Sequence, residues 1–333
     1  MAQPPVLAKA FIMALLLIAV VPGAAATQAV GERGRRGKAK GGKAPCDTEL
    51  VPVSMPGATS GVAQWEMCIH PPEQDIYLSK LLKQGTVFDP QVQEAIARVT
   101  AMHANRSSAS PPPSPPPPSQ PRKPCFVDVG GNIGTFSLYA AALGYRTFTF
   151  EPLPRNYQRL LASREHNQFL DMKVYSAAAS DSVSTVDLYM WAGNFGSVFI
   201  PTGDDDPRLA RGEVTYVGSS VTVPLGQLLT PDKFPFIQLM KMDCEGHEEH
   251  ALRGALSLFA SHRVGTLVVE VQPSPHAGSE HPLFQILKFG YQSFSLPSYK
   301  PVSRAKLTRL LQNNAMGDRF ELMVTLHGSL LHA

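Results

Sequence analysis

A glycine-rich turn between two apolar segments is the feature that most constrains the fold of this chain. The first segment and the turn read Phe126-Val-Asp-Val-Gly-Gly-Asn-Ile-Gly134, and the second segment reads Phe148-Thr-Phe-Glu151-Pro. A strand, a glycine turn that opens a helix, and a second strand that ends on an acid form the unit with which α/β proteins hold a nucleotide-like cofactor. We therefore predict a strand-turn-helix-strand unit here, with a cofactor site at the turn.

Strand and helix patterns alternate regularly on both sides of this unit. Single helices between strands imply a parallel sheet with right-handed crossovers. The last two strands have no regular helical pattern between them, so they are expected to form an antiparallel edge. The predicted class is α/β with a mostly parallel sheet, with strands at 125–129, 146–150, 172–178, 185–190, 237–242, 266–271, 291–296 and 320–326 and helices over 133–143 and from Pro154.

The chain before Cys125 is organised differently. Residues 10–21 form an unbroken run of twelve apolar residues after Lys9, which suits a signal-peptide core better than a transmembrane helix of about 20 residues. The predicted organisation is a signal peptide or anchor at 1–26, a disordered basic arm at 27–45, a small helical extension at 46–109, a proline-rich linker at 110–124 and the main domain at 125–333.

The net charge and the N-terminal segment limit which partners and which cellular location we expect. The formal charge is +3, but residues 1–31 contribute +1 and residues 32–43 contribute +5, which leaves −3 for residues 44–333. A mildly acidic domain gives no support to nucleic-acid binding. We expect a secretory-pathway location (lumen of the endoplasmic reticulum or Golgi, or secreted). The alternatives are membrane anchoring through the N-terminal segment, which the basic arm keeps open, and an organelle.

The positions of the four cysteines favour one disulfide bond. Cys125 begins a predicted strand and Cys244 follows the far end of another, whereas a disulfide needs Cα atoms within about 7 Å. Those two should not pair, which leaves Cys46 with Cys68 as the preferred bridge in an oxidising compartment. Four reduced, mostly buried thiols are the alternative.

Four acids are predicted at one edge of the sheet. Asp128 and Glu151 end the first two strands, and Asp243 and Glu245 follow the strand at 237–242. Ligands of open α/β sheets bind at the carboxyl ends of the strands. Mutual repulsion among such acids raises at least one pKa, which suits a general base. The plainer alternative is that Asp243 caps the next helix and that Glu245 favours its positive end.

These residues also carry a family resemblance. The chain resembles the FkbM family of S-adenosylmethionine-dependent methyltransferases from about Phe126 to Pro297. The resemblance rests on the turn at 128–134, on Phe150-Glu-Pro152 and Ala178-Ala-Ser-Asp181, and most specifically on Lys241-Met-Asp-Cys-Glu-Gly246 followed by Leu252-Arg-Gly-Ala255. The family commonly has alanine where Gly131 stands, and it tends to have an aspartate where this chain has Gly226.

The resemblance implies a Rossmann-like class I methyltransferase fold with S-adenosyl-L-methionine as cofactor. By it, Asp128, Gly130, Asn132 and Gly134 surround the methionine and ribose, Glu151 takes the ribose hydroxyls, and Ser180 and Asp181 lie beside the adenine. The segment Gly193-Asn-Phe-Gly-Ser197 is then a mobile loop over the acceptor.

Asp243 is the first candidate for the catalytic base, followed by Glu270 and Glu245. The expected reaction is methylation of a hydroxyl group. The expected acceptor is a sugar, such as a glycan, or another small molecule. The alternatives are an NAD-dependent oxidoreductase, which Asn132 disfavours because the dinucleotide fingerprint has glycine there, and a non-catalytic luminal binding module. The preferred interpretation contains no metal, although Asp243, Glu245 and Glu270 together are a conceivable oxygen-ligand site.

Overall fold

The computed structural model describes residues 46–56, 61–86, 88–107, 123–273, 278, 280–312 and 319–326. The predicted signal peptide or anchor, the basic arm and all but the last two residues of the proline-rich linker lie outside this part of the chain. Among the described helices, none has the length and apolar character needed to cross a membrane.

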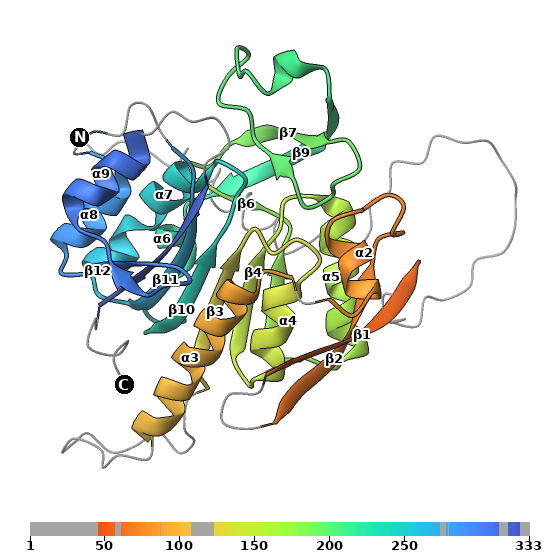
Figure 1. The fold of residues 1–333 in the computed structure, drawn as a ribbon, viewed down its shortest axis with the longest axis horizontal. Coiled ribbons are helices and arrows are strands. Elements are labelled where there is room, and N and C mark those ends of the chain that lie inside the picture. The colour runs from red at the N-terminus through yellow and green to blue at the C-terminus, as the bar shows by residue number, and fades with distance from the viewer. Residues whose placement is uncertain are drawn as a thin grey trace, which may run out of the picture.

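Within the described residues, eight strands form one large sheet in the order β13-β12-β14-β11-β10-β3-β4-β5 (Figure 1). Neighbours from β11 to β5 run parallel, whereas β14 is antiparallel to β11 and β12. The elements are β3 (Cys125–Val129), α4 (Thr135–Ala142), β4 (Arg146–Phe150), α5 (Pro154–His166), β5 (Met172–Tyr175), α6 (Leu225–Leu228), β10 (Ile237–Met242), α7 (Glu248–Ala260), β11 (Val264–Val271), α8 (Pro282–Lys288), β12 (Gln292–Ser295), β13 (Lys300–Pro301), α9 (Arg304–Gln312) and β14 (Phe320–Thr325).

The order of strands creates a switch point beside β3. The chain proceeds from β3 to β4 and β5 on one side, and then returns to place β10 and β11 on the other side. A crevice forms where neighbouring connections leave in opposite directions. The carboxyl ends of β3 and β10 therefore meet at the position where such folds bind ligands.

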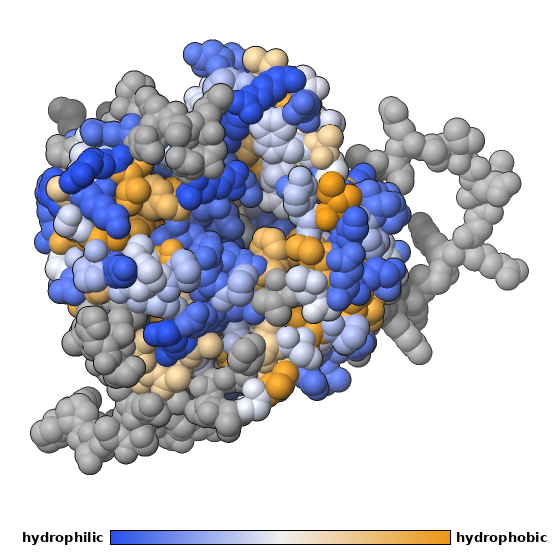
Figure 2. Space-filling model, viewed as in Figure 1, coloured by the Kyte–Doolittle hydropathy of each residue, from blue (hydrophilic) through white to orange (hydrophobic). Residues whose placement is uncertain are grey.

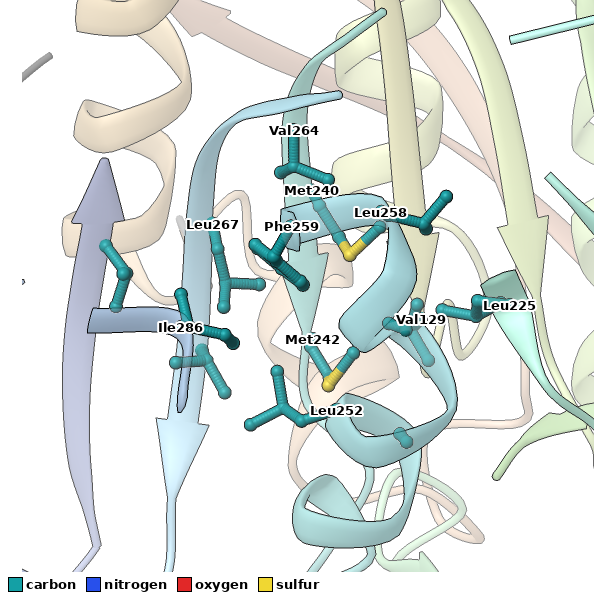
Figure 3. Packing of buried hydrophobic residues seen from close by; sticks show 14 of the residues in the cluster. Val129, Leu225, Met240, Met242, Leu252, Leu258, Phe259, Val264, Leu267 and Ile286 are labelled. Carbon is teal, nitrogen blue, oxygen red and sulfur yellow. The ribbon is translucent and has the colours of Figure 1, made fainter. Parts of the chain in front are cut away.

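The sheet is covered on both faces, and its central strands are buried along almost their whole length. Alternate residues of β3 and β10 face two separate cores, one formed with α6 to α9 and one with α4 and the N-terminal extension. Figure 3 shows the first core, in which Leu252, Leu258 and Phe259 of α7 lie over Met240 and Met242 of β10.

The N-terminal extension is only partly helical, which corrects the prediction. It contains a hairpin of β1 (Glu49–Pro56) and β2 (Val62–Ile69), followed by α2 (Leu78–Lys83) and α3 (Pro90–Ser107). Residues with a period of two, such as Val53 and its partner Trp65, face the core, so the hairpin has a sequence signal that the helical interpretation passed over. The disulfide Cys46–Cys68 closes this unit, as predicted.

A smaller sheet stands beyond the carboxyl ends of β3 and β4, at the top of Figure 1. Its order is β6-β9-β7-β8 within the described residues. The prediction contained one of these strands at nearly its observed bounds. The elements are β6 (Ala178–Ala179), β7 (Thr185–Trp191), β8 (Val198–Phe199), the 3-10 helix η1 (Leu209–Arg211) and β9 (Val214–Val223).

Candidate active site

The glycine turn is built by close approach of backbones. The N–H groups of Gly130 and Gly131 both donate to the carbonyl of Phe150, at 3.0 Å. Gly130 has φ 79°, and a Cβ there would lie 1.7 Å from the carbonyl oxygen of Asp243. Only glycine fits this position, because β10 ends directly against the turn. Gly130 therefore serves the contact between β10 and the turn, in addition to lining the cavity.

Glu151 ends β4 and is 3% exposed. Its Oε2 accepts the N–H of Asn132 at 2.8 Å, and its Oε1 accepts the N–H of Leu153 at 2.9 Å. Burial raises the pKa of Glu151 to about 7, although these hydrogen bonds oppose the shift. Oε1 also accepts a longer hydrogen bond from Asn156 Nδ2, at 3.4 Å. A carboxylate oxygen can accept two hydrogen bonds, so Oε2 retains capacity for a ligand hydroxyl.

A cavity of about 230 Å³ opens at the switch point. Figure 2 shows hydrophilic residues gathered across the middle of this face, below the smaller sheet. Three parts of the chain line the cavity: the turn with Gly130, Asn132 and Glu151, the end of β10 with Asp243 and Glu245, and an apolar wall from the smaller sheet. The N-terminal extension adds Tyr77, Leu78 and Phe88.

Lys241 neutralises the acids at the end of β10. It is 5% exposed, and its Nζ lies 3.2 Å from Asp243 Oδ2 and 3.8 Å from Asp128 Oδ1. Burial favours the neutral amine, but Asp243 and Asp128 outweigh it and raise the pKa of Lys241. Asp128 itself is fully buried and does not line the cavity. Its carboxylate orients Lys241 and accepts the hydroxyl of Ser137 from beneath the site.

Arg319 joins the other two predicted catalytic acids. It lies 2.8 Å from Glu245 and 3.0 Å from Glu270. Burial and the charge of Asp243 raise the pKa of Glu245 and of Glu270, and Arg319 opposes both shifts. Glu245 lines the cavity, while Glu270 lies behind Asp243. Of the three candidates for the base, Asp243 and Glu245 face the cavity directly.

The acid beside Asp243 and Glu270 is Glu248. Ligand oxygens of these three residues lie within 4.8 Å of one another, so the structure brings Glu248 into the set where the sequence analysis had placed Glu245. Glu248 is buried at the start of α7 and accepts the N–H groups of Cys244 and Gly246. Burial, assisted by Asp243, raises the pKa of Glu248 to about 7.

Ser180 and Asp181 contact two histidines at the start of α7, His247 and His250. Ser180 Oγ lies 3.0 Å from His247 Nε2, and Asp181 Oδ2 lies 2.9 Å from His250 Nδ1. Neither Ser180 nor Asp181 lines the cavity, whereas His247 does. Their predicted place beside the adenine stays a prediction.

The segment Gly193 to Ser197 lies over the cavity, to which it contributes Asn194, Phe195 and Gly196. The N–H of Ile76 donates to the carbonyl of Gly193 at 3.3 Å. Asn156 Nδ2 donates to the carbonyl of Phe195 at 3.1 Å. The loop therefore lines the cavity, while its predicted place over the acceptor and its mobility stay predictions.

Several site residues were missing from the sequence analysis. Lys241 had a signal, because a lysine inside an apolar strand is rarely buried without a partner. Asn156, Arg319 and the extension residues Tyr77 and Phe88 had no such signal, since only the folded chain brings them to the edge of the sheet.

Comparison with known families decides between the remaining interpretations. Residues 128–293 match the model of the methyltransferase FkbM domain. The chain belongs to the FkbM methyltransferase family. S-adenosylmethionine is therefore the cofactor of this FkbM methyltransferase, and the nicotinamide alternative is not supported.

Other comparisons add less. Among curated proteins, none matches the chain significantly. A TehB-like S-adenosylmethionine-dependent methyltransferase from Corynebacterium glutamicum shares 11% identity at TM-score 0.35, covering 74% of this chain and 92% of its own. An S-adenosylmethionine-dependent methyltransferase from Agrobacterium tumefaciens shares 11% identity at TM-score 0.37. The match covers 83% of this chain and 69% of that protein. Likenesses this weak add nothing to the family match.

The residues present fit the cofactor. Asn132 Oδ1 is a buried acceptor that lacks a hydrogen-bond partner among the described residues, and Asn132 lines the cavity. Glu151 can accept hydroxyl hydrogens at the same turn. The apolar wall suits the faces of an adenine ring; its residues are Ala178, Ala179, Leu188, Phe195, Val198 and Ile200.

Proposed function

We propose that this FkbM methyltransferase is an O-methyltransferase that acts on a hydroxyl of a sugar or another small acceptor in the secretory pathway. The observation that carries the proposal is the position of Asp243. It lies at the switch point, lines the cavity that Glu151 and Asn132 also line, and keeps 31% of its side chain exposed. A carboxylate at that position can take a proton from a bound hydroxyl.

The chain's own residues align the acceptor and manage the proton. When bound, S-adenosylmethionine would supply an activated methyl group to the acceptor oxygen and leave as S-adenosylhomocysteine. Asp243 would take the proton that the acceptor hydroxyl releases. Lys241, at 3.2 Å, keeps Asp243 oriented as a carboxylate before the transfer. Alignment of the two reactants supplies much of the remaining acceleration.

Replacement of Asp243 tests this role. Asp243→Asn keeps the shape of the side chain and removes the base, so we expect turnover to fall about 100-fold or more. Methylation of a panel of free sugars and glycosides, with S-adenosylhomocysteine as the measured product, gives the rate. Calorimetric titration with S-adenosylhomocysteine should show affinity within about threefold of the wild type. Asp232→Asn, on an exposed loop, is the matched control and should change neither value.

Two results would contradict parts of the proposal. Unchanged turnover in Asp243→Asn would exclude Asp243 as the base and transfer the role to Glu245, the other candidate that lines the cavity, to be checked with Glu245→Gln. Wild-type binding of S-adenosylhomocysteine without methylation of any hydroxyl acceptor would favour the non-catalytic module.

The proposed compartment rests on separate observations. The disulfide Cys46–Cys68 suits an oxidising lumen, and residues 10–21 have the length of a signal-peptide core. Cleavage and protease protection after translation in the presence of microsomes test this location. Full accessibility to protease would contradict it, and protection without cleavage would favour the membrane-anchored form.

A further inference from the structure

His70 is a buried polar residue of the N-terminal extension, directly after β2. It is 1% exposed. Its Nε2 lies 2.6 Å from Asn156 Oδ1 of α5. Its ring stacks on Phe195, with centroids 4.1 Å apart and planes 9° from parallel. The extension thus contacts α5 and the loop at 193–197 through one side chain.

Both contacted residues belong to the cofactor cavity. Asn156 and Phe195 line it. The amide nitrogen of Asn156 donates to the Phe195 carbonyl at 3.1 Å and reaches Glu151 Oε1 at 3.4 Å. Because this nitrogen donates, the amide oxygen is the acceptor that faces His70, and His70 donates through Nε2–H. His70 therefore fixes the side-chain amide of Asn156 through its oxygen. The nitrogen of the same amide orients the loop and Glu151.

The surroundings of His70 keep its ring neutral and fixed. Burial lowers the pKa of His70 to about 4; Arg159 and Arg155 of α5 act in the same direction, while the bond to Asn156 and the charge of Asp75 oppose it. The backbone N–H of His70 donates to Ser79 Oγ at 3.1 Å. The ring therefore presents the same Nε2–H donor throughout the neutral pH range.

We propose that His70 is a positioning residue of the cofactor site, which orients the Asn156 amide with its Nε2–H and seats Phe195 with its ring. Through Asn156 it sets the carboxylate of Glu151, and through Phe195 it sets the loop over the cavity. The proposal concerns cofactor binding alone and does not depend on the acceptor or on the role of Asp243.

Two substitutions at His70 separate its contacts. His70→Phe keeps a flat ring against Phe195 and removes the donor. His70→Gln places an amide N–H near the position of Nε2 and so restores the donor to Asn156. Titration of the full chain with S-adenosylhomocysteine should give about tenfold weaker binding for His70→Phe and binding within about threefold of the wild type for His70→Gln. His262→Phe, on an exposed histidine that contacts the carbonyl of Phe289, is the matched control and should bind as the wild type does.

A double-substitution cycle tests whether His70 acts through Asn156. Asn156→Ala alone should weaken binding, and adding His70→Phe should then have little further effect, because the two residues form one chain of contacts. Thermal denaturation of each variant reports folding separately, so a purely structural role would lower the melting temperature and leave the affinity of the folded protein unchanged.

The proposal fails if folded His70→Phe binds S-adenosylhomocysteine as tightly as the wild type, or if its loss is the same in the Asn156→Ala background. If His70→Phe does not fold, His70→Asn replaces it, since its shorter amide does not reach the Nε2 position. Weaker binding by His70→Asn than by His70→Gln then supports the proposal, and equal binding overturns it.

Discussion

At the scale of single residues, the site depends on the ion pairs that Lys241 makes with Asp128 and Asp243. Asp128 is fully buried and Lys241 is nearly so, while Asp243 extends into the cavity. Buried charges persist only when paired. Asp128 therefore holds Lys241, and Lys241 holds Asp243 at the cavity wall. The arrangement explains why an acid that ends β3 contributes to the site without facing it.

The raised pKa of Glu151 predicts the pH dependence of cofactor affinity. Ionised Glu151 accepts ribose hydroxyls better than its protonated form does. With a pKa of about 7, the affinity for S-adenosylhomocysteine should rise about tenfold from pH 6 to pH 8 and then level off. Calorimetry across this range measures it. Glu151→Gln should bind more weakly and remove the slope; a flat wild-type profile would contradict the prediction.

The free energy of unfolding should depend on pH in the opposite direction to the cofactor affinity. The pKa of Glu151 in the fold lies above its ordinary value of 4.5, so the folded protein binds this proton more tightly than the unfolded chain does. The stabilising contribution is complete below about pH 4.5 and is lost as the pH rises through about 7.

Residue identities at the edge of the sheet were predictable, but their orientations were not. Asp128 stands near the carboxyl end of its strand, and Glu151 and Asp243 directly follow theirs, so their common edge follows from topology alone. Whether a side chain faces the cavity depends on partners distant in sequence. Asp128 faces Lys241, Ser180 contacts His247, and neither pairing has a signature in spacing.

At the scale of elements, the predictable strands are the apolar ones. Cys125–Val129, Arg146–Phe150 and Ile237–Met242 were predicted at their observed bounds. The first and third are mostly apolar, as buried parallel strands are, and the second alternates threonine with phenylalanine, two residues that favour strands. β9 is only partly buried and contains Gly218 and two serines, so it lacked that signal. Helix α9 also lies between the last two predicted strands, where no helix was expected.

The β1–β2 hairpin depends on its disulfide. Cys46 and Cys68 enclose a loop with a sequence separation of 22 residues. The chain-entropy argument gives about 3 kcal/mol for a loop of this size, so a protein with Cys46→Ser and Cys68→Ser should lose about that much free energy of unfolding. Urea denaturation measures the loss. Reductant should destabilise the wild type and leave the double variant unchanged; equal sensitivity of both would contradict the prediction.

At the scale of the whole molecule, the extension is part of the enzyme domain. Met67, Ile69 and Ile96 are fully buried, and they share one core with Phe126 of β3 and Leu239 of β10. The cavity is likewise lined from both sides of the proline-rich segment. The cofactor cavity is therefore built by the parts on both sides of that segment.

This shared core predicts that the two parts stay together without a covalent link. We expect a protein with a protease site inserted within residues 110–122 to keep its pieces associated after cleavage, because separation would expose the fully buried Met67, Ile69 and Ile96 to water. Gel filtration should give one peak at the mass of the intact chain, and affinity for S-adenosylhomocysteine should stay within about threefold of the uncleaved protein. The same insertion without protease is the control. Two peaks, or loss of binding on cleavage, would mean that the extension is held in place by the linker and not by its packing.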